Sequence, residues 1–119
     1  MIRETEVKYV ISNEIPALAI DLSLVNRKND LYKCIECLTD YTKDLIREHK
    51  ISEVKDCFRT AYELLHEGTS LVKLAVVSIY INSVSRLLEG SFCPEQSVRS
   101  EFLKNFGEEY HQLIYARNP

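Results

Sequence analysis

The most apolar helix that this chain can form lies at 71–88, and this stretch constrains the fold more than any other. It reads LVKLAVVSIYINSVSRLL and has a glycine on either side, at positions 68 and 90. Apolar side chains occupy almost every direction around such a helix, and its narrow polar stripe is Ser78, Asn82, Ser85 and Glu89. We therefore expect a helix over 70–89, buried on most sides in the middle of a bundle. A strand over 74–81 is the alternative, because valine and isoleucine favour strands.

The same stretch is expected to be too short and too polar to cross a membrane. A span needs about 20 apolar residues, whereas Lys73 and Arg86 bracket about twelve uncharged residues, of which four are serine or asparagine. The N-terminal segment MIRETEVKYVISNE is charged throughout and has no continuous apolar core, so we expect no secretory signal. These observations predict a cytoplasmic protein that makes no membrane contact and keeps its thiols reduced.

Apolar residues recur at helical spacing in the rest of the chain as well. The expected helices cover 3–13, 16–25, 31–48, 52–66 and 95–116. Pro16 separates the first two, because proline removes a backbone donor and suits the first turn of a helix. The connections are short, so neighbouring helices are expected to be antiparallel. The predicted fold is all-α: one domain over 1–119, with about six helices in antiparallel hairpins, packed as a compact bundle or a short HEAT-like α-solenoid.

Residues at the ends of these segments support the expected boundaries. Capping or first-turn positions are occupied by Asp30, by Thr69 or Ser70, and by Pro94. Gly68 and Gly90 stand where a helix often ends in a left-handed glycine. Gly107 lies inside the last apolar stripe, which predicts a bend in that helix.

The composition argues against a nucleic-acid partner. The chain has 119 residues, 28% of them charged, and a net charge of -3. Basic residues are scattered among acidic ones, so no basic stripe is available for a phosphate backbone. The tight turn HEGTS is followed by the most apolar helix, whereas a helix-turn-helix needs a polar, basic recognition helix.

The pair Cys34-x-x-Cys37 has the spacing of a redox or zinc motif, but it falls within the first turns of a predicted helix. A thioredoxin-like pair needs a strand before it, and a zinc site needs two further ligands. Cys57 and Cys93 stand alone in the sequence. We expect both cysteines of the pair to pack as small apolar residues, with no metal or cofactor site.

The histidines and carboxylates do not form a recognisable catalytic motif. His49 and His66 fall near predicted helix ends, where the helix dipole favours them. Glu108-x-x-His111 has the spacing of a di-iron bundle motif, but it occurs once and such a site needs it twice. We expect no catalytic residues and no enzyme activity.

Tyrosine is frequent for so short a chain, at seven residues. Its apolar body and polar tip suit either the rim of a core or an interface. The candidate interaction surface is Tyr32, Tyr62, His66 and Tyr110. We expect a non-enzymatic interaction domain that binds a protein partner or a second copy of itself. The alternative is an enzyme or a small-ligand domain, with a pocket between helices lined by Tyr62, His66 or Tyr80.

Several segments resemble a family of small, all-helical bacterial proteins of unknown function. The segments that carry the resemblance are EIPAL, DLYKCIECLTDYTKDLI, VKDCFRTAYELLHEG and LVKLAVVSIYINSVSRLL. The resemblance implies an orthogonally packed, helical-repeat-like fold. Some members look like immunity proteins, which neutralise a toxin by binding it, so it also implies a role as an immunity-like inhibitor or a dimeric adaptor.

Overall fold

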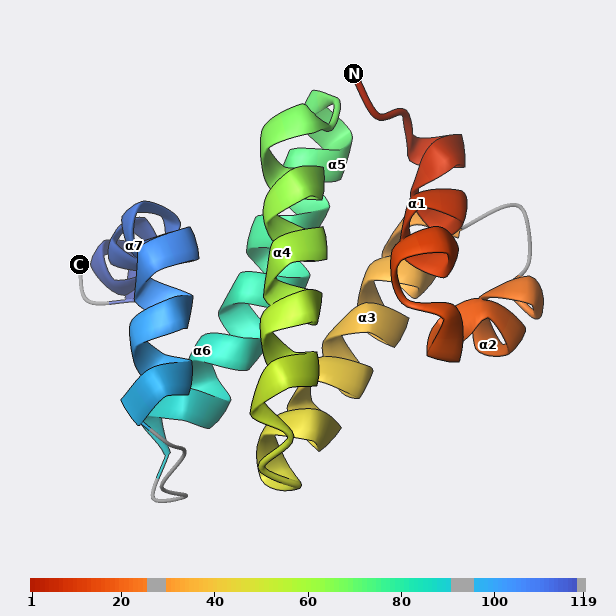
Figure 1. Ribbon diagram of the computed structural model, residues 1–119. Helices are drawn as coiled ribbons and strands as arrows, with labels where there is room; N and C mark the ends of the chain where they lie inside the picture. The colour runs from red at the N-terminus through yellow and green to blue at the C-terminus, as the bar shows by residue number, and fades with distance from the viewer. Residues whose placement is uncertain (26–29, 91–95, 118–119) are drawn as a thin grey trace.

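The chain folds into helices in the order that the apolar pattern predicts (Figure 1). The computed structural model describes residues 1–25, 30–90 and 96–117, with the side chains of Asp30 and Arg117 left out of the description. Its elements are η1 (Glu4–Glu6), α1 (Val7–Glu14), η2 (Pro16–Leu18), α2 (Ala19–Ser23), α3 (Asp30–Arg47), α4 (Ile51–Glu67), α5 (Ser70–Ala75), η4 (Val76–Ile81), α6 (Asn82–Glu89) and α7 (Gln96–Arg117). The all-α fold class is confirmed, and the strand considered for 74–81 is wrong because that segment is helical.

Helix α4 holds the other elements together. In Figure 1 it runs through the middle, with α1 and α3 on one side, α7 on the other, and α5, η4 and α6 behind it. The Cα radius of gyration is 13.7 Å, close to the value of about 13.5 Å expected for a compact chain of this length. The arrangement is therefore a compact bundle and not an extended solenoid.

One hydrophobic core draws side chains from α1 through to α7. Its largest fully buried members include Ile11, Ile35, Phe58, Tyr80 and Phe106. Tyr80 is buried with its hydroxyl 3.0 Å from Thr42 Oγ1. The Thr42 hydroxyl donates to the Leu38 carbonyl, so its oxygen accepts from Tyr80. A buried hydroxyl needs such a partner, because an unpaired one costs about 1–3 kcal/mol.

The predicted helix 70–89 is interrupted by one wide turn. Residues Val76–Ile81 form a π-helix between α5 and α6, which accommodates one more residue than an α-helical turn. The extra residue rotates the following segment. Ser85, which the sequence placed on the polar stripe, is accordingly only 1% exposed, and its hydroxyl donates to the Asn82 carbonyl.

One face of this helical run is open to solvent, so the run is less buried than expected. Leu71 and Leu74 are 52% and 57% exposed. Within the described residues, the 20-residue run Ser70–Glu89 is long and apolar enough to cross a membrane by length and composition alone, which also corrects the expectation that it is too short and polar. The core helix of a globular protein passes the same test. In the run Ser70–Glu89, 44% of the most apolar window is buried inside the protein.

The turn between α4 and α5 is closed by the start of the chain. Ile2 donates to the Glu67 carbonyl and accepts from the Thr69 amide, forming an isolated parallel bridge with Gly68. The Thr69 side chain accepts from the Val72 amide and caps α5, as predicted. Its hydroxyl donates to Glu4 Oε2 at 3.0 Å. The turn is therefore held by hydrogen bonds to Ile2, to Glu4 and to the first turn of α5.

Gly68 is needed here for space and not for a left-handed conformation. Its φ is -81° and ψ 162°, and Gly90 is extended as well, so both glycines end their helices as predicted, but without the left-handed conformation. A Cβ at position 68 would collide with the Leu64 carbonyl oxygen and lie 2.5 Å from Val72 Cγ1. The N-terminal end of α5 thus packs directly on a position without a side chain.

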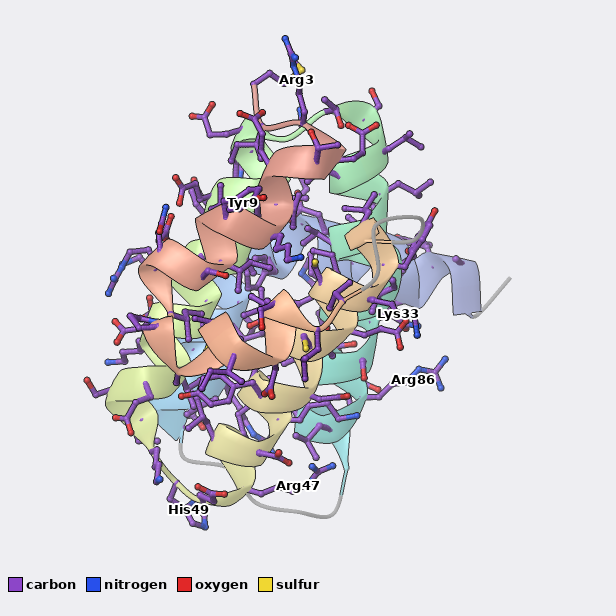
Figure 2. The ribbon with its side chains drawn as sticks, turned by 90° about the vertical axis from the view of Figure 1, so that its right-hand side faces the viewer. Arg3, Tyr9, Lys33, Arg47, His49 and Arg86 are labelled. Carbon is purple, nitrogen blue, oxygen red and sulfur yellow. The ribbon has the colours of Figure 1, made fainter. Side chains whose placement is uncertain are left out.

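The left-handed residue in the described chain is His49, with φ 59°, in the turn between α3 and α4 (Figure 2). Its amide donates to the Ile46 carbonyl, and the Lys50 amide donates to the Leu45 carbonyl. This pair of bonds is the Schellman pattern that ends many helices. His66 lies in the last turn of α4, as predicted.

The remaining boundary predictions have mixed outcomes. Pro16 occupies the first turn of η2, as expected. Helix α7 rises beside α4 and then turns away (Figures 1 and 2), and Gly107 lies in the middle of its sequence, as the predicted bend requires. The Asp30 cap, the start at Pro94 and the position of Cys93 lie outside the described residues and side chains.

Candidate interaction surface

Helices α4 and α7 are joined by a cluster of aromatic rings. The Phe58 ring lies 5.8 Å from that of Phe102 and 5.9 Å from that of Phe106, in edge-on geometry. The Phe102 and Phe106 rings are themselves 5.4 Å apart. Each such pair adds about 0.5–1.5 kcal/mol beyond the area that it buries. The cluster fixes which faces of the two helices point outward.

The outward face of α4 presents two rings one turn apart. Tyr62 and His66 stack with their centroids 4.0 Å apart and their planes at 38°. Tyr62 is 41% exposed, and His66 is exposed at the end of the helix. Residues at i and i+4 face the same way on a helix, so the two stacked rings form one continuous aromatic surface beside α7.

The outward face of α7 presents Leu103, which is 48% exposed. Leu103 borders two hollows. One, of about 150 Å³, lies between α6 and α7 and is lined by Ser85, Leu88, Glu89, Arg99, Phe102, Leu103 and Tyr110. The other, of about 230 Å³, lies between α4 and α7 and is lined by Tyr62, His66, Leu103, Lys104, Asn105, Gly107, Glu108 and Glu109. We call Tyr62, His66, Leu103 and Tyr110, with the hollows between them, the Leu103 surface.

Tyr110 closes the far side of the first hollow. Its hydroxyl donates to Glu89 Oε2 at 2.6 Å, and its ring meets Phe102 edge-on at 5.9 Å. A short hydrogen bond to a carboxylate is among the stronger kinds. Tyr110 therefore ties α7 to the end of α6 and holds the polar rim of this hollow in place.

The structure brings together three of the four residues proposed from the sequence. Tyr62 and His66 stack on α4, and Tyr110 lies on α7 beyond Leu103. Tyr32, at 46% exposed, lies in the first turn of α3, which starts behind α1 on the side away from α7 (Figure 1). Tyr32 is therefore not part of the Leu103 surface.

Sequence reasoning missed Leu103, although a signal was present. The apolar stripe of α7 runs through Phe102, Phe106 and Tyr110, and Leu103 falls one position outside it. A large aliphatic residue out of phase with the buried stripe must either widen that stripe or meet solvent. Here it meets solvent.

The three residues expected to line a pocket between helices lie in two different places. Tyr62 and His66 border the hollow between α4 and α7, whereas Tyr80 is fully buried in the core. A third hollow, of about 160 Å³, lies beside Glu14, Pro16, Tyr41 and Cys57. These three hollows are smaller than the 300–1,000 Å³ typical of small-ligand sites.

The described cysteines are at least partly buried, and this burial raises the pKa of two of their thiols. Cys34 and Cys57 are buried thiols, and Cys37 is half-buried. Apolar packing is therefore confirmed for Cys34, which lies in the core, and for Cys37, which packs against it. Burial raises the pKa of Cys57 to about 11, and burial followed by the charge of Asp21 raises that of Cys37. A thiol bonds metal or attacks disulfides as its thiolate, and these shifts oppose that form. Among the described residues, no three histidine, cysteine, aspartate or glutamate side chains are grouped as a metal site would require.

A carboxyl group of α4 has a raised pKa because it lies close to a carboxyl group of α1. A hydrogen bond with Glu14, then burial and the nearby charge of Glu14, raise the pKa of Glu63 from 4.5 to about 7. Thr60 also donates to Glu14 Oε1 at 3.0 Å. Like charges this close favour one protonated member, so Glu63 donates to the Glu14 carboxylate while it holds its proton.

This pair predicts a pH-dependent contribution to stability. Because the folded state raises the pKa of Glu63, its stabilisation is complete below about pH 4.5 and is lost as pH rises through about 7. Relative to Glu63→Gln, the wild-type free energy of unfolding should fall by about 1 kcal/mol between about pH 5 and pH 8, allowing for solvent screening. Urea unfolding of both proteins at each pH measures the difference. A difference that stays constant with pH would contradict the raised pKa of Glu63.

Comparison with known proteins adds one relation. A family model described as a domain of unknown function, DUF7674, matches residues 8–118. The expectation from the resemblance, a family of unknown function, is thereby confirmed, while an immunity role is no part of that description. No curated protein and no solved structure matches the chain.

Proposed function

The chain belongs to the DUF7674 family, and from its surface we propose that it is a non-enzymatic domain that binds another protein through the Leu103 surface. The observation that carries the proposal is Leu103 itself. It is a half-exposed aliphatic side chain set between two hollows and flanked by the stacked Tyr62 and His66 rings. Binding interfaces are typically built on a central cluster of aromatic or aliphatic anchors within a polar rim.

The rim of this surface has the expected polarity. Arg99 and Glu89 border one hollow, and Lys104 and Glu108 border the other. The Tyr62–His66 stack and the Tyr110 hydrogen bond limit the motion of the contact groups before binding. A preorganised surface loses less conformational entropy when a partner docks.

Several features of the proposal come from the sequence and stand as part of it. We place the protein in the cytoplasm, away from membranes and nucleic acid, with a protein partner. An immunity-like role is one form of the proposal, in which the partner is a toxin. A dimeric adaptor is another, in which the partner is a second copy of the chain.

Photo-crosslinking in the native host tests the proposed surface. A benzophenone amino acid replaces Tyr62 in one variant and Tyr9 in another, because both are exposed tyrosines on helices and Tyr9 lies on α1, on the side away from α7 (Figure 2). The expected result is one dominant crosslinked protein from position 62 and none from position 9. Adding Leu103→Asp to the position-62 variant should abolish the product, because a charge replaces the apolar anchor.

The outcomes separate the alternatives. A product from position 62 that depends on Leu103 supports the proposal, and mass spectrometry of it distinguishes a toxin, another protein or a second copy. Equal products from positions 62 and 9, or a product that persists with Leu103→Asp, would show that binding uses a different surface.

A further inference from the structure

We infer that the partner that fits the Leu103 surface is a second copy of this chain, bound through α7 across a two-fold axis. The inference rests on the proposed function and names its partner. It is carried by two features of the surface: a knob and a hole that lie beside each other, and flanking charges of opposite sign.

The knob is Leu103 and the hole is the hollow over Gly107. Leu103 and Gly107 are four residues apart on α7, so they follow each other along one face of the helix. A Cβ built at Gly107 meets nothing within 4 Å, and the hollow beside it measures about 230 Å³. A two-fold contact is self-complementary, so a surface carrying both a knob and a hole can fill each with the other.

The second feature is the order of charges along the same face. Lys104 and Glu108 are both exposed and lie one turn apart. Neither forms an ion pair within the part of the chain that the structure describes. Both charges are therefore available to a partner, with the basic residue nearer the start of the helix.

An antiparallel pairing of two α7 helices uses both features at once. With the two-fold axis passing at position 105, Leu103 of each copy faces Gly107 of the other. The same axis places Lys104 of each copy about 3 Å along the helix from the level of Glu108 of the other, which a lysine side chain spans. A glycine close to the axis lets two backbones approach closely, and complementary charges fix the register.

Sedimentation equilibrium of the purified protein, over a concentration series into the millimolar range, tests this inference. The wild type is expected to dimerise. Lys104→Glu and Glu108→Lys should each raise the dimer Kd by about tenfold or more, because each sets like charges opposite each other twice. The double variant Lys104→Glu/Glu108→Lys restores the pairing, and its Kd should return to within about threefold of wild type.

Gly107→Ala supplies a readout that loss of folding cannot imitate. The added methyl group fills the hole and should raise the dimer Kd by about tenfold, while circular dichroism shows the helix content retained or increased. Lys33→Glu, on α3 away from the surface (Figure 2), is the charge control and should leave the Kd unchanged.

A wild-type protein that stays monomeric throughout the series, or a double variant that fails to recover, would overturn the second-copy inference. The proposed function is tested separately. Capture of a different protein from position 62, dependent on Leu103, would leave the Leu103 surface standing with another partner.

Discussion

Replacing Gly68 with alanine is expected to lower the free energy of unfolding by about 3 kcal/mol. The φ of this residue is -81°, which any residue adopts, so the loss is steric. A Cβ would meet the Leu64 carbonyl and the Val72 side chain, which is fully buried. The backbone oxygen has no free torsion to rotate away, so the start of α5 must move off the end of α4. Urea denaturation followed by circular dichroism measures the change.

The matched control is a glycine that has space for a side chain. Gly107 lies within α7, and a Cβ there has open space around it. Gly107→Ala should therefore raise the free energy of unfolding by about 1 kcal/mol, the difference in helix propensity between the two residues. The measurement belongs at low protein concentration, where self-association does not contribute. If both glycine variants lost stability equally, the packing explanation for Gly68 would be wrong.

Phe58→Ala is expected to lower the free energy of unfolding by about 4 kcal/mol. Phe58 is fully buried and its ring contacts those of Phe102 and Phe106. The substitution removes the ring that holds α7 on α4 and leaves a cavity between them. Because the Leu103 surface is built from these two helices, amide hydrogen exchange of α7 should accelerate more than that of α1.

Two control variants separate the packing of α7 from general damage. Phe58→Leu keeps most of the volume and should cost about 1–1.5 kcal/mol. Tyr32→Ala removes an aromatic ring that is 46% exposed on α3 and should change stability by about 0.5 kcal/mol or less. Equal acceleration of exchange in α1 and α7 of Phe58→Ala would indicate that Phe58 supports the whole core and not the α4–α7 contact in particular.

The helices were predictable because apolar residues recur at helical spacing along the chain. The stripe Val7, Ile11, Ile15, Leu18 and Leu22 is buried throughout, even though Pro16 divides it into two segments. Burial depends on which direction a side chain takes around the helix, and spacing of three and four encodes that direction. Local chemistry was equally informative at Thr69, whose hydroxyl caps the helix that the sequence led us to expect there.

The errors arose where tertiary contacts override a local rule. Gly68 suggested a left-handed turn, but its role is to let two helices approach, which no local pattern reveals. A π-turn has no residue signature distinct from an α-turn, so the wide turn and the burial of Ser85 were not foreseen. Partial exposure of the apolar run, at Leu71 and Leu74, depends on which neighbours cover it.

The candidate surface was predictable in part. Tyr62 and Tyr32 were expected on an interaction surface, and both are exposed. Grouping them required knowing which helices adjoin, and α3 begins on the side away from α7. Leu103 was not predicted because its place between two hollows depends on how α4 and α6 pack against α7.

The wide turn at Val76–Ile81 has a consequence for the family's evolution. A π-turn inside an α-helix corresponds to a single inserted residue. A family member that keeps an uninterrupted α-helix at this point should therefore be one residue shorter between the positions equivalent to Val76 and Ile81. An alignment that puts the gap elsewhere would pair inward-facing positions of α6 with outward-facing ones, and would misjudge which substitutions natural selection has tolerated there.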